Sequence, residues 1–372
     1  MNIERISSEQ AVVGMISATD IFAKNKLLIE KNTELTERSI IRLKLYGVRE
    51  LKVFASNEKN AYVQEEEEHI PQDEPVNEDN MSYHEKVRRT KEFICFQDSI
   101  VSYANSLKNY LDTIIKDNEQ LDTERLVSEI EAILVESRNG LHVIDMLNCM
   151  RTYDDDTYIH SVNVALLCYI MGGWMRYSLS ETRLLALSGL LHDIGKLMIP
   201  QELITKPSQL TPEEYLRVKE HTNKGYFILK HQDLDVRVKR AALMHHEKCD
   251  GSGYPLGLTR SQIEPFAKIV AIADIYEAMT AKRVYRGRIC PFEVIAIFEK
   301  EGLQKYDPVY LLTFLERVIE AYINNWVLLS NEEKAEIIMI NKYDLAKPVV
   351  RTQNSDFIDL SKERDIDILA II

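Results

Sequence analysis

The feature of this sequence that most constrains its fold is a series of histidines and aspartates spaced at helix-length steps. Nine histidines occur in 372 residues, and five of the six that lie between positions 160 and 246 belong to this series. Apart from one adjacent pair, successive members of the series are 24 to 32 residues apart, and a helix with its turn takes about 15–25 residues. This spacing predicts candidate metal ligands on the facing helices of an antiparallel bundle. The series is His160, His192, His221, His245, His246 and Asp274.

His192 and Asp193 adjoin each other at the end of an apolar run that indicates a buried helix. A buried His–Asp pair is costly unless the two side chains are paired or bound to metal, and the two oxygens of Asp193 allow it to bridge two ions. Lys196 follows one turn later, on the side from which it can contact a substrate phosphate. Gly195 is the predicted end of the helix. For this motif alone, a structural His–Asp hydrogen bond with a surface lysine explains the residues equally well.

His245 and His246 follow a second apolar helix, and a loop dense in turn-forming residues comes after them at 250–255. Adjacent imidazoles diverge by about 100° on a helix, so this pair can reach two neighbouring metal ions where the helix ends. We expect Glu247 to brace a ligand rather than to bind metal, as carboxylates behind metal sites often do. Asp274 lies within an Ala-rich apolar helix, where a carboxylate needs a partner or a metal ion.

His160 begins a long uncharged stretch, and its place in the series makes it a predicted ligand, although a lone histidine beside a core helix is usually structural. Asp156 precedes it by one helical turn, so both side chains can face one point. Three roles are open for Asp156: a metal ligand, a partner that supports a ligand, or a helix cap. Further along the chain, Arg283 and Arg286 lie in a basic cluster that either binds phosphate or forms a solvated turn.

The formal net charge of −13 is largely a property of one segment, because residues 64–80 hold eight acidic residues and no Lys or Arg. An anionic substrate is therefore compatible with the composition where metals or local basic residues supply positive charge. Five cysteines lie far apart without a CxxC pair, and the first residues form no apolar signal sequence. These features predict a cytoplasmic protein. Residues 157–175 carry no formal charge, but their His, Ser, Asn and Gly residues predict a buried core helix rather than membrane insertion.

The hydrophobic pattern predicts a mainly α fold with a small unit at each end. Apolar residues recur at three- and four-residue steps from 83 onward, which indicates helices whose stripes are core contacts or a homodimer surface. The predicted parts are a small α+β N-terminal domain at 1–55, an acidic linker at 56–82, a helical region at 83–153, a helical domain with the histidine series at 154–328 and a C-terminal β extension at 329–372. Short strands are expected at 12–15, 26–30, 50–54, 335–340, 348–350, 357–360 and 366–368, and a short helix at 36–43.

At the residues of the histidine series the chain strongly resembles the HD-GYP family of bacterial cyclic-di-GMP phosphodiesterases, a branch of the HD superfamily. Both motifs that name the family are present, as His192-Asp193 and as Gly253-Tyr254-Pro255. The resemblance covers about residues 154–328, and Thr222 is a small departure, since the family commonly has proline after this histidine. The matching set also contains His160-Ser161, Ile194-Gly195-Lys196, His221, His245-His246-Glu247, Asp250-Gly251 and Ala273-Asp274.

The resemblance implies an HD-type helical bundle that hydrolyses cyclic-di-GMP to pGpG and onward to GMP, with two divalent metal ions, iron or manganese. It implies catalytic roles for Asp193 and Lys196. Family members with a third ion have a glutamate one turn before the first histidine, where this chain has Asp156, so we expect two ions; Asp156 and Glu247 are left for a third ion or for support of the ligands. The implied ligands are His160, His192, Asp193, His221, His245, His246 and Asp274, and the implied phosphate or guanine contacts are Lys196, Glu277, Arg283 and Arg286.

Two other functions are open at this point: a catalytically weak nucleotide-binding signalling scaffold, and an HD hydrolase that acts on another nucleotide. The complete ligand set argues against the first, and the second histidine pair with the Gly-Tyr-Pro loop argues against the second. The expected partners are the cyclic dinucleotide, a second copy of the chain through the helical region, and signalling proteins. We expect no DNA or RNA polymer and no membrane insertion.

Overall fold

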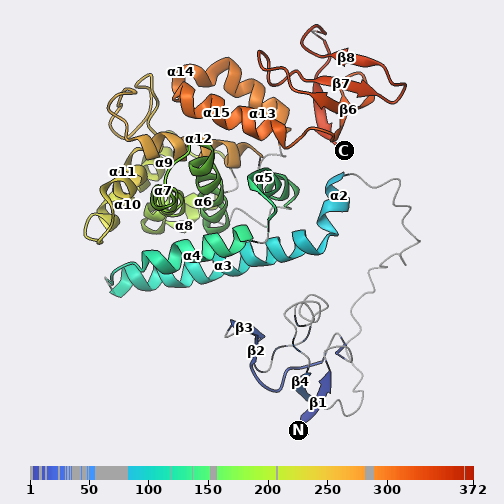
Figure 1. Ribbon diagram of the computed structural model, residues 1–372. Coiled ribbons are helices and arrows are strands. Elements are labelled where there is room, and N and C mark those ends of the chain that lie inside the picture. The colour runs from blue at the N-terminus through green and yellow to red at the C-terminus, as the bar shows by residue number, and fades with distance from the viewer. Residues whose placement is uncertain are drawn as a thin grey trace. The chain divides into compact units, whose positions relative to one another are not determined.

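Figure 1 shows the computed structural model of the chain, which divides into two compact units, Met1–Pro75 and Val76–Ile372. Each unit has a hydrophobic core of its own. The predicted linker at 56–82 lies outside the described residues, as does most of the predicted helix at 36–43. The described residues are 3–7, 11–12, 15–23, 26–29, 31, 33, 35, 43, 48, 50–54, 83–117, 119–135, 137–150, 157–206, 208–280, 289–363 and 365–372.

The N-terminal unit contains two antiparallel strand pairs around a small apolar core. The strands predicted at 26–30 and 50–54 are present. The strand predicted at 12–15 is wrong at its described residues, because the amide of Met15 donates to the carbonyl of Val12 and closes a turn there. The pairs are β1 (Ile3–Ser7) with β4 (Glu50–Phe54), and β2 (Ile21–Ala23) with β3 (Lys26–Ile29).

Helices α6 (Thr157–Trp174) and α7 (Leu179–Leu191) form the centre of the larger unit, and α12 (Pro265–Thr280) packs against both. Every residue of α6 from Ser161 to Cys168 is buried, which explains its uncharged sequence. Among the described residues, we find no helix whose length and apolar character would allow it to cross a membrane. The remaining elements of this part are η2 (Ile194–Met198), α8 (Gln201–Ile204), α9 (Pro212–Lys219), α10 (His221–Leu229) and α11 (Val236–Met244).

The helical region that precedes α6 buries its apolar stripes inside the chain. Helix α3 contacts α6, and α4 contacts α7 (Figure 1). Ile100 and Leu107 on α3 and Ile130 on α4 have at most 1% of their surface exposed. These side chains are therefore core contacts, and a homodimer through this region stays a prediction. The region comprises α2 (Tyr83–Arg88), α3 (Lys91–Asp117), α4 (Thr123–Val135) and α5 (Gly140–Cys149).

The last part of the chain is a five-stranded antiparallel sheet that follows a further group of helices. Its strand order is β8-β7-β6-β5-β9, so the last strand returns to pair with the first. The predicted strands correspond to β6 to β9, whereas β5 begins before residue 329 and was not predicted. Helices make up most of the larger unit and this sheet forms only its last part, so the predicted mainly α fold class is confirmed. The elements are α13 (Pro291–Ile297), η3 (Phe298–Gly302), α14 (Leu303–Lys305), α15 (Pro308–Glu320), β5 (Trp326–Leu329), β6 (Lys334–Met339), β7 (Val349–Thr352), β8 (Phe357–Asp359) and β9 (Ile368–Ile371).

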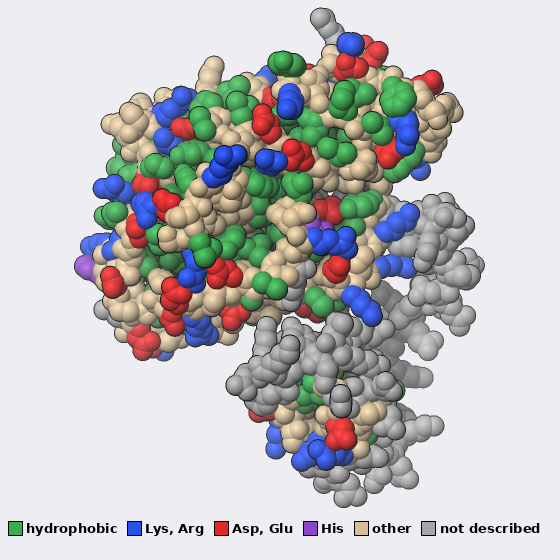
Figure 2. Space-filling view, viewed as in Figure 1, with side chains coloured by type: hydrophobic (Ala, Val, Ile, Leu, Met, Phe, Trp, Pro, Cys, Tyr) green, Lys and Arg blue, Asp and Glu red, His purple; other side chains and the backbone are tan. Residues whose placement is uncertain are grey.

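The surface of the larger unit carries both signs of charge. On the face in Figure 2, acidic and basic side chains are interspersed over the coloured part of this unit. Ion pairs of this unit include Lys206 with Glu214 and Arg351 with Glu336. This agrees with the sequence, in which eight of the acidic residues that set the net charge of −13 fall within residues 64–80.

Gly195 brings two segments of the site into contact and does not end a helix. Helix α7 ends at Leu191, and Gly195 lies within the 3-10 turn η2. A Cβ atom on Gly195 would overlap the carbonyl oxygen of His221 and the amide nitrogen of Gly225 on α10. The predicted role of Gly195 as a terminator is thus corrected: a missing side chain there lets η2 lie directly against α10.

We predict that Gly195→Ala destabilises the protein, because backbone atoms of α10 cannot move aside as a side chain can. The expected loss in the free energy of unfolding is about 1–3 kcal/mol, as for other overpacked positions. Denaturant unfolding measures it. Gly173→Ala is the matched control: a Cβ atom there meets nothing within 4 Å, and alanine in a helix should stabilise by up to about 1 kcal/mol. Equal stability of the two variants would contradict the packing argument.

Candidate metal centre

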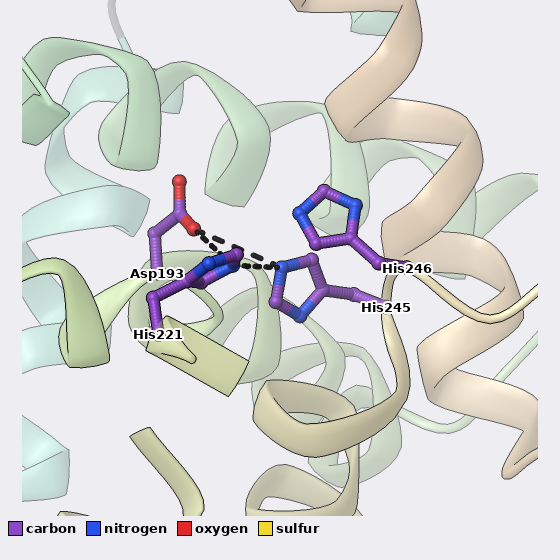
Figure 3. A group of neighbouring side chains, drawn as sticks. All are labelled: Asp193, His221, His245 and His246. Atoms are coloured by element: carbon purple, nitrogen blue, oxygen red, sulfur yellow. Dashed lines mark hydrogen bonds and ion pairs between the residues drawn. The ribbon is translucent and has the colours of Figure 1, made fainter. Parts of the chain in front are cut away.

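The structure brings the seven predicted ligands together within the helical bundle. They form two groups, and within each group the ligand atoms lie within 4.8 Å of one another. Figure 3 shows the first group, in which His221 and His245 turn toward the Asp193 carboxylate. The Asp193 group consists of Asp193, His221, His245 and His246, and the His160 group consists of His160, His192 and Asp274.

The ligands come from segments whose ends meet in the bundle. His160 and Asp274 lie within the long helices α6 and α12, whereas His192 and Asp193 follow the last residue of α7. His221 is the first residue of α10, and the pair His245-His246 follows α11. Helix ends free the backbone from the regular 100° step, so neighbouring residues can turn toward different ions.

The carboxylate of Asp193 lies between the two groups. Its Oδ1 is 3.3 Å from Nε2 of His221 and 3.7 Å from Nε2 of His245. Its Oδ2 is 3.2 Å from Nε2 of His192 and 3.7 Å from Nε2 of His160. One oxygen thus faces each group, which is the geometry that a bridging carboxylate needs.

Asp193 is ionised although it is buried. Burial alone would raise its pKa, but the ammonium of Lys196 and the neighbouring His192 hold the pKa of this carboxyl well below its usual range. The Nζ atom of Lys196 lies 2.5 Å from Oδ2 of Asp193. Asp274 behaves in the same way, because His160 outweighs the effect of burial and lowers its pKa. The pKa of both carboxyls thus lies below its usual range, at the buried Asp193 and at the half-buried Asp274.

Backbone carbonyls fix the tautomers of three histidines. The Nδ1 atoms of His192 and His221 each lie 2.7 Å from a carbonyl oxygen three residues earlier, and Nδ1 of His245 lies 3.1 Å from the carbonyl oxygens of Ala241 and Ala242. Because a carbonyl oxygen can only accept, Nδ1 carries the proton in each ring. The lone pair on Nε2 then points into the centre, as a metal ligand requires.

These lone pairs need a cation. The Nε2 atoms of His221 and His245 face each other at 3.3 Å, and two acceptors at that distance repel unless something positive lies near them. Nε2 of His192 and Oδ1 of Asp193 are buried without a hydrogen-bond partner. Burial lowers the pKa of His221 and His245, and that of His246 falls to about 3. Neutral imidazoles and carboxylates in this arrangement fit divalent metal ions.

Glu277 orients the His160 ring by contacting its Nδ1 atom, the nitrogen that faces away from Asp193 and Asp274. Its Oε2 lies 2.5 Å from Nδ1 of His160, and its Oε1 accepts a hydrogen bond of 3.0 Å from the amide of Asn163. Burial lowers the pKa of His160, but Glu277 and Asp274 outweigh it and raise the pKa to about 10. The sequence did not single out Asn163. The available signal was its position one turn after His160 inside an uncharged, buried helix.

Glu247 holds the Gly-Tyr-Pro loop. Its two carboxylate oxygens accept hydrogen bonds of 2.7 and 2.8 Å from the backbone amides of Leu256 and Leu258. The carboxylate therefore braces this loop, and its support of a ligand or of a third ion stays a prediction. Gly253 lies so close to the Glu247 backbone that a Cβ atom would overlap it. This contact places Tyr254 against His246, with ring centroids 4.7 Å apart and planes 28° apart.

The other predicted site residues divide between described and undescribed positions. Lys196 is described and contacts Asp193. Asp156, Arg283 and Arg286 lie outside the described residues, so their roles stay predictions.

Comparisons with known proteins identify the region that holds the centre. A family model described as an HD domain matches residues 159–309. Three curated relatives are similar to the chain. A cyclic di-GMP phosphodiesterase of Pseudomonas aeruginosa is 36% identical over 43% of this chain and 38% of its own length. A 3'3'-cGAMP-specific phosphodiesterase of Vibrio cholerae is 37% identical over 42% of this chain and 36% of its own.

The third relative, a cyclic di-GMP phosphodiesterase of Thermotoga maritima, is 34% identical over 58% of this chain and 56% of its own length. The chain thus spans 36–56% of the length of these three relatives. All seven ligands of the two groups fall inside the matched region. Residues 159–309 therefore match an HD domain, and the predicted resemblance of this region to cyclic di-GMP phosphodiesterases is confirmed.

Proposed function

We propose that the HD domain of this chain is a metal-dependent phosphodiesterase that hydrolyses cyclic di-GMP to pGpG and onward to GMP. The observation that carries this proposal is the Asp193 carboxylate, which turns one oxygen to each of two ligand groups. Paired metal sites suit phosphodiester cleavage, where charge develops on the attacking and leaving oxygens at once.

The side chains of the two groups have distinct tasks in this reaction. The Asp193 group and the His160 group would each hold one divalent ion, iron or manganese, and share Asp193. Two such ions supply Lewis acidity and an activated water. Glu277 keeps the His160 ring oriented, and the backbone carbonyls keep the other imidazoles in the ligand tautomer. The described ligands support two ions, and a third would depend on Asp156.

Lys196 is the described residue best placed to receive a substrate phosphate. Its side chain is 26% exposed, whereas its partner Asp193 is 2% exposed. With Asp193 engaged as a ligand, the Lys196 ammonium would be free to turn toward the negative charge of the phosphate. We propose Arg283 and Arg286 as further contacts, because guanidinium groups bind phosphate in a bidentate manner. We also propose Glu277 as a phosphate or guanine contact, the role that the family resemblance implies for this position.

The names of the relatives support a cyclic dinucleotide as the substrate class. Two of the three are named for cyclic di-GMP and one for 3'3'-cGAMP. We propose a cytoplasmic location, because the cysteines form no disulfide among the described residues and a reducing compartment keeps thiols in that state. Regulation by signalling proteins is part of the same proposal.

Turnover by protein purified without oxygen and loaded with iron or manganese tests the proposed function. The substrate panel contains cyclic di-GMP, 3'3'-cGAMP, GTP and guanosine tetraphosphate. We expect linear and mononucleotide products from cyclic di-GMP. Binding of cyclic di-GMP without products would favour the signalling scaffold, and preference for a mononucleotide would favour another HD hydrolase. Either result would overturn the assignment.

We predict that Asp193→Ala removes both ions and abolishes activity, because the substitution takes one ligand from each group. Metal analysis of the purified variant and a turnover assay check this. Asp145→Asn is a matched control, since Asp145 is also buried but its carboxylate accepts a hydrogen bond from Tyr83 at 2.6 Å. The control should keep wild-type metal content. An Asp193→Ala variant with both ions and normal turnover would refute the bridging role.

We predict that Glu277→Gln weakens metal binding in the His160 group, because a neutral amide no longer raises the basicity of the His160 ring. Loss of such a supporting carboxylate lowers metal affinity or activity by about 10–100-fold. Metal titration monitors the affinity. The control is Glu299→Gln, whose carboxylate accepts hydrogen bonds from the amides of Leu345 and Ala346 instead. A rise in KM with unchanged metal affinity would assign Glu277 to the substrate and contradict the supporting role.

A further inference from the structure

Lys219, the last residue of α9, lies beside the metal centre without being one of its ligands. Its ammonium nitrogen is 4.8 Å from the ring centroid of Tyr254 and 4.6 Å from that of Tyr215, one helical turn earlier. The Tyr254 ring in turn stacks on His246, with centroids 4.7 Å apart. A continuous series of contacts thus leads from the metal centre, through Tyr254, to the positive charge of Lys219.

Local sequence places Lys219 in this position. Helix α9 starts with a capping box formed by Thr211 and Glu214, with Pro212 at its first turn. Lys219 lies four residues after Tyr215, so both side chains are on one face of this helix. Lys219 also precedes His221, the first residue of α10, by two residues. The position of this ligand therefore holds the end of α9, and with it Lys219, close to the centre.

The charge of Lys219 has no carboxylate partner within ion-pair distance in the part of the chain that the structure describes. In contrast, Lys196 pairs with Asp193 at 2.5 Å, and Lys224 pairs with Glu220 at 3.0 Å. Aromatic faces attract a cation without cancelling its charge. The half-buried ammonium of Lys219 is thus held in place and remains able to bind an anion.

We propose that Lys219 binds the phosphate of the cyclic dinucleotide that is not cleaved. The inference rests on the proposed function, and it adds a second phosphate contact to it. A cyclic dinucleotide has two phosphodiester groups, of which the metal centre and Lys196 hold the one that reacts. Lys219 contacts Tyr254, and Tyr254 contacts His246, so the ammonium lies beyond the ligands rather than among them. It is therefore a specificity-determining residue and takes no part in bond breaking.

Lys219→Gln tests this assignment, because it replaces the ammonium by a neutral amide. The quantity to measure is kcat/KM for cyclic di-GMP divided by kcat/KM for bis(p-nitrophenyl) phosphate, which has a single phosphodiester group. We expect this ratio to fall about tenfold, which matches the loss of one charge-assisted hydrogen bond. The fall should come from a higher KM for cyclic di-GMP. Lys219→Arg keeps the charge and should restore most of the ratio.

Lys230→Gln is the matched control. Lys230 also lies over an aromatic ring, that of Phe227, at 4.0 Å, but it follows the last residue of α10, whereas His221 is the first. Its ratio should equal that of the wild type. An unchanged ratio in Lys219→Gln, or an equal loss on both substrates, would overturn the assignment and leave the proposed function intact. Wild-type protein that cleaves the single phosphodiester but no cyclic dinucleotide would overturn both.

Discussion

Asp193 presents its two carboxylate oxygens to two different sets of imidazole nitrogens, and the surrounding segments keep those nitrogens in place. The arrangement is unfavourable by itself, since it buries a negative charge and several lone pairs without enough donors. Lys196 offsets part of that cost through its contact with Asp193. Divalent ions would offset the rest of this cost. The buried carboxylate and the lone pairs are therefore both the source of the cost and the groups that would bind the ions.

The fold makes this concentration of polar groups possible by surrounding it with apolar helices and close backbone contacts. The central helices α6, α7 and α12 supply a rigid apolar frame. Gly195 lets the turn after Asp193 lie against α10, which brings His221 to the centre. Glu247 and Gly253 hold the following loop so that Tyr254 covers His246. The buried carboxylate of Glu247 thus acts on the centre indirectly, through the loop that carries Tyr254.

The ligand set was predicted from helix-length spacing and from the resemblance to the HD-GYP motifs, both of which can be read from local sequence. The sequence did not predict that the Glu247 carboxylate accepts hydrogen bonds from loop amides, since these bonds depend on the path of the loop. Gly195 was misread for the same reason: its role depends on α10, about 26–30 residues away in the chain. Strand β1 (Ile3–Ser7) was missed because Ile3 and Ile6 do not alternate, and its pairing with β4 spans most of the N-terminal unit.

The most direct measurement is a crystal structure of anaerobically purified, metal-loaded protein, with anomalous scattering collected at the absorption edge of the metal. Sharing of Asp193 predicts two anomalous peaks about 3.5–4 Å apart, one beside each carboxylate oxygen. The first peak should contact His221, His245 and His246, and the second His160, His192 and Asp274. A single peak, or two peaks that do not share Asp193, would contradict the bridged two-metal centre.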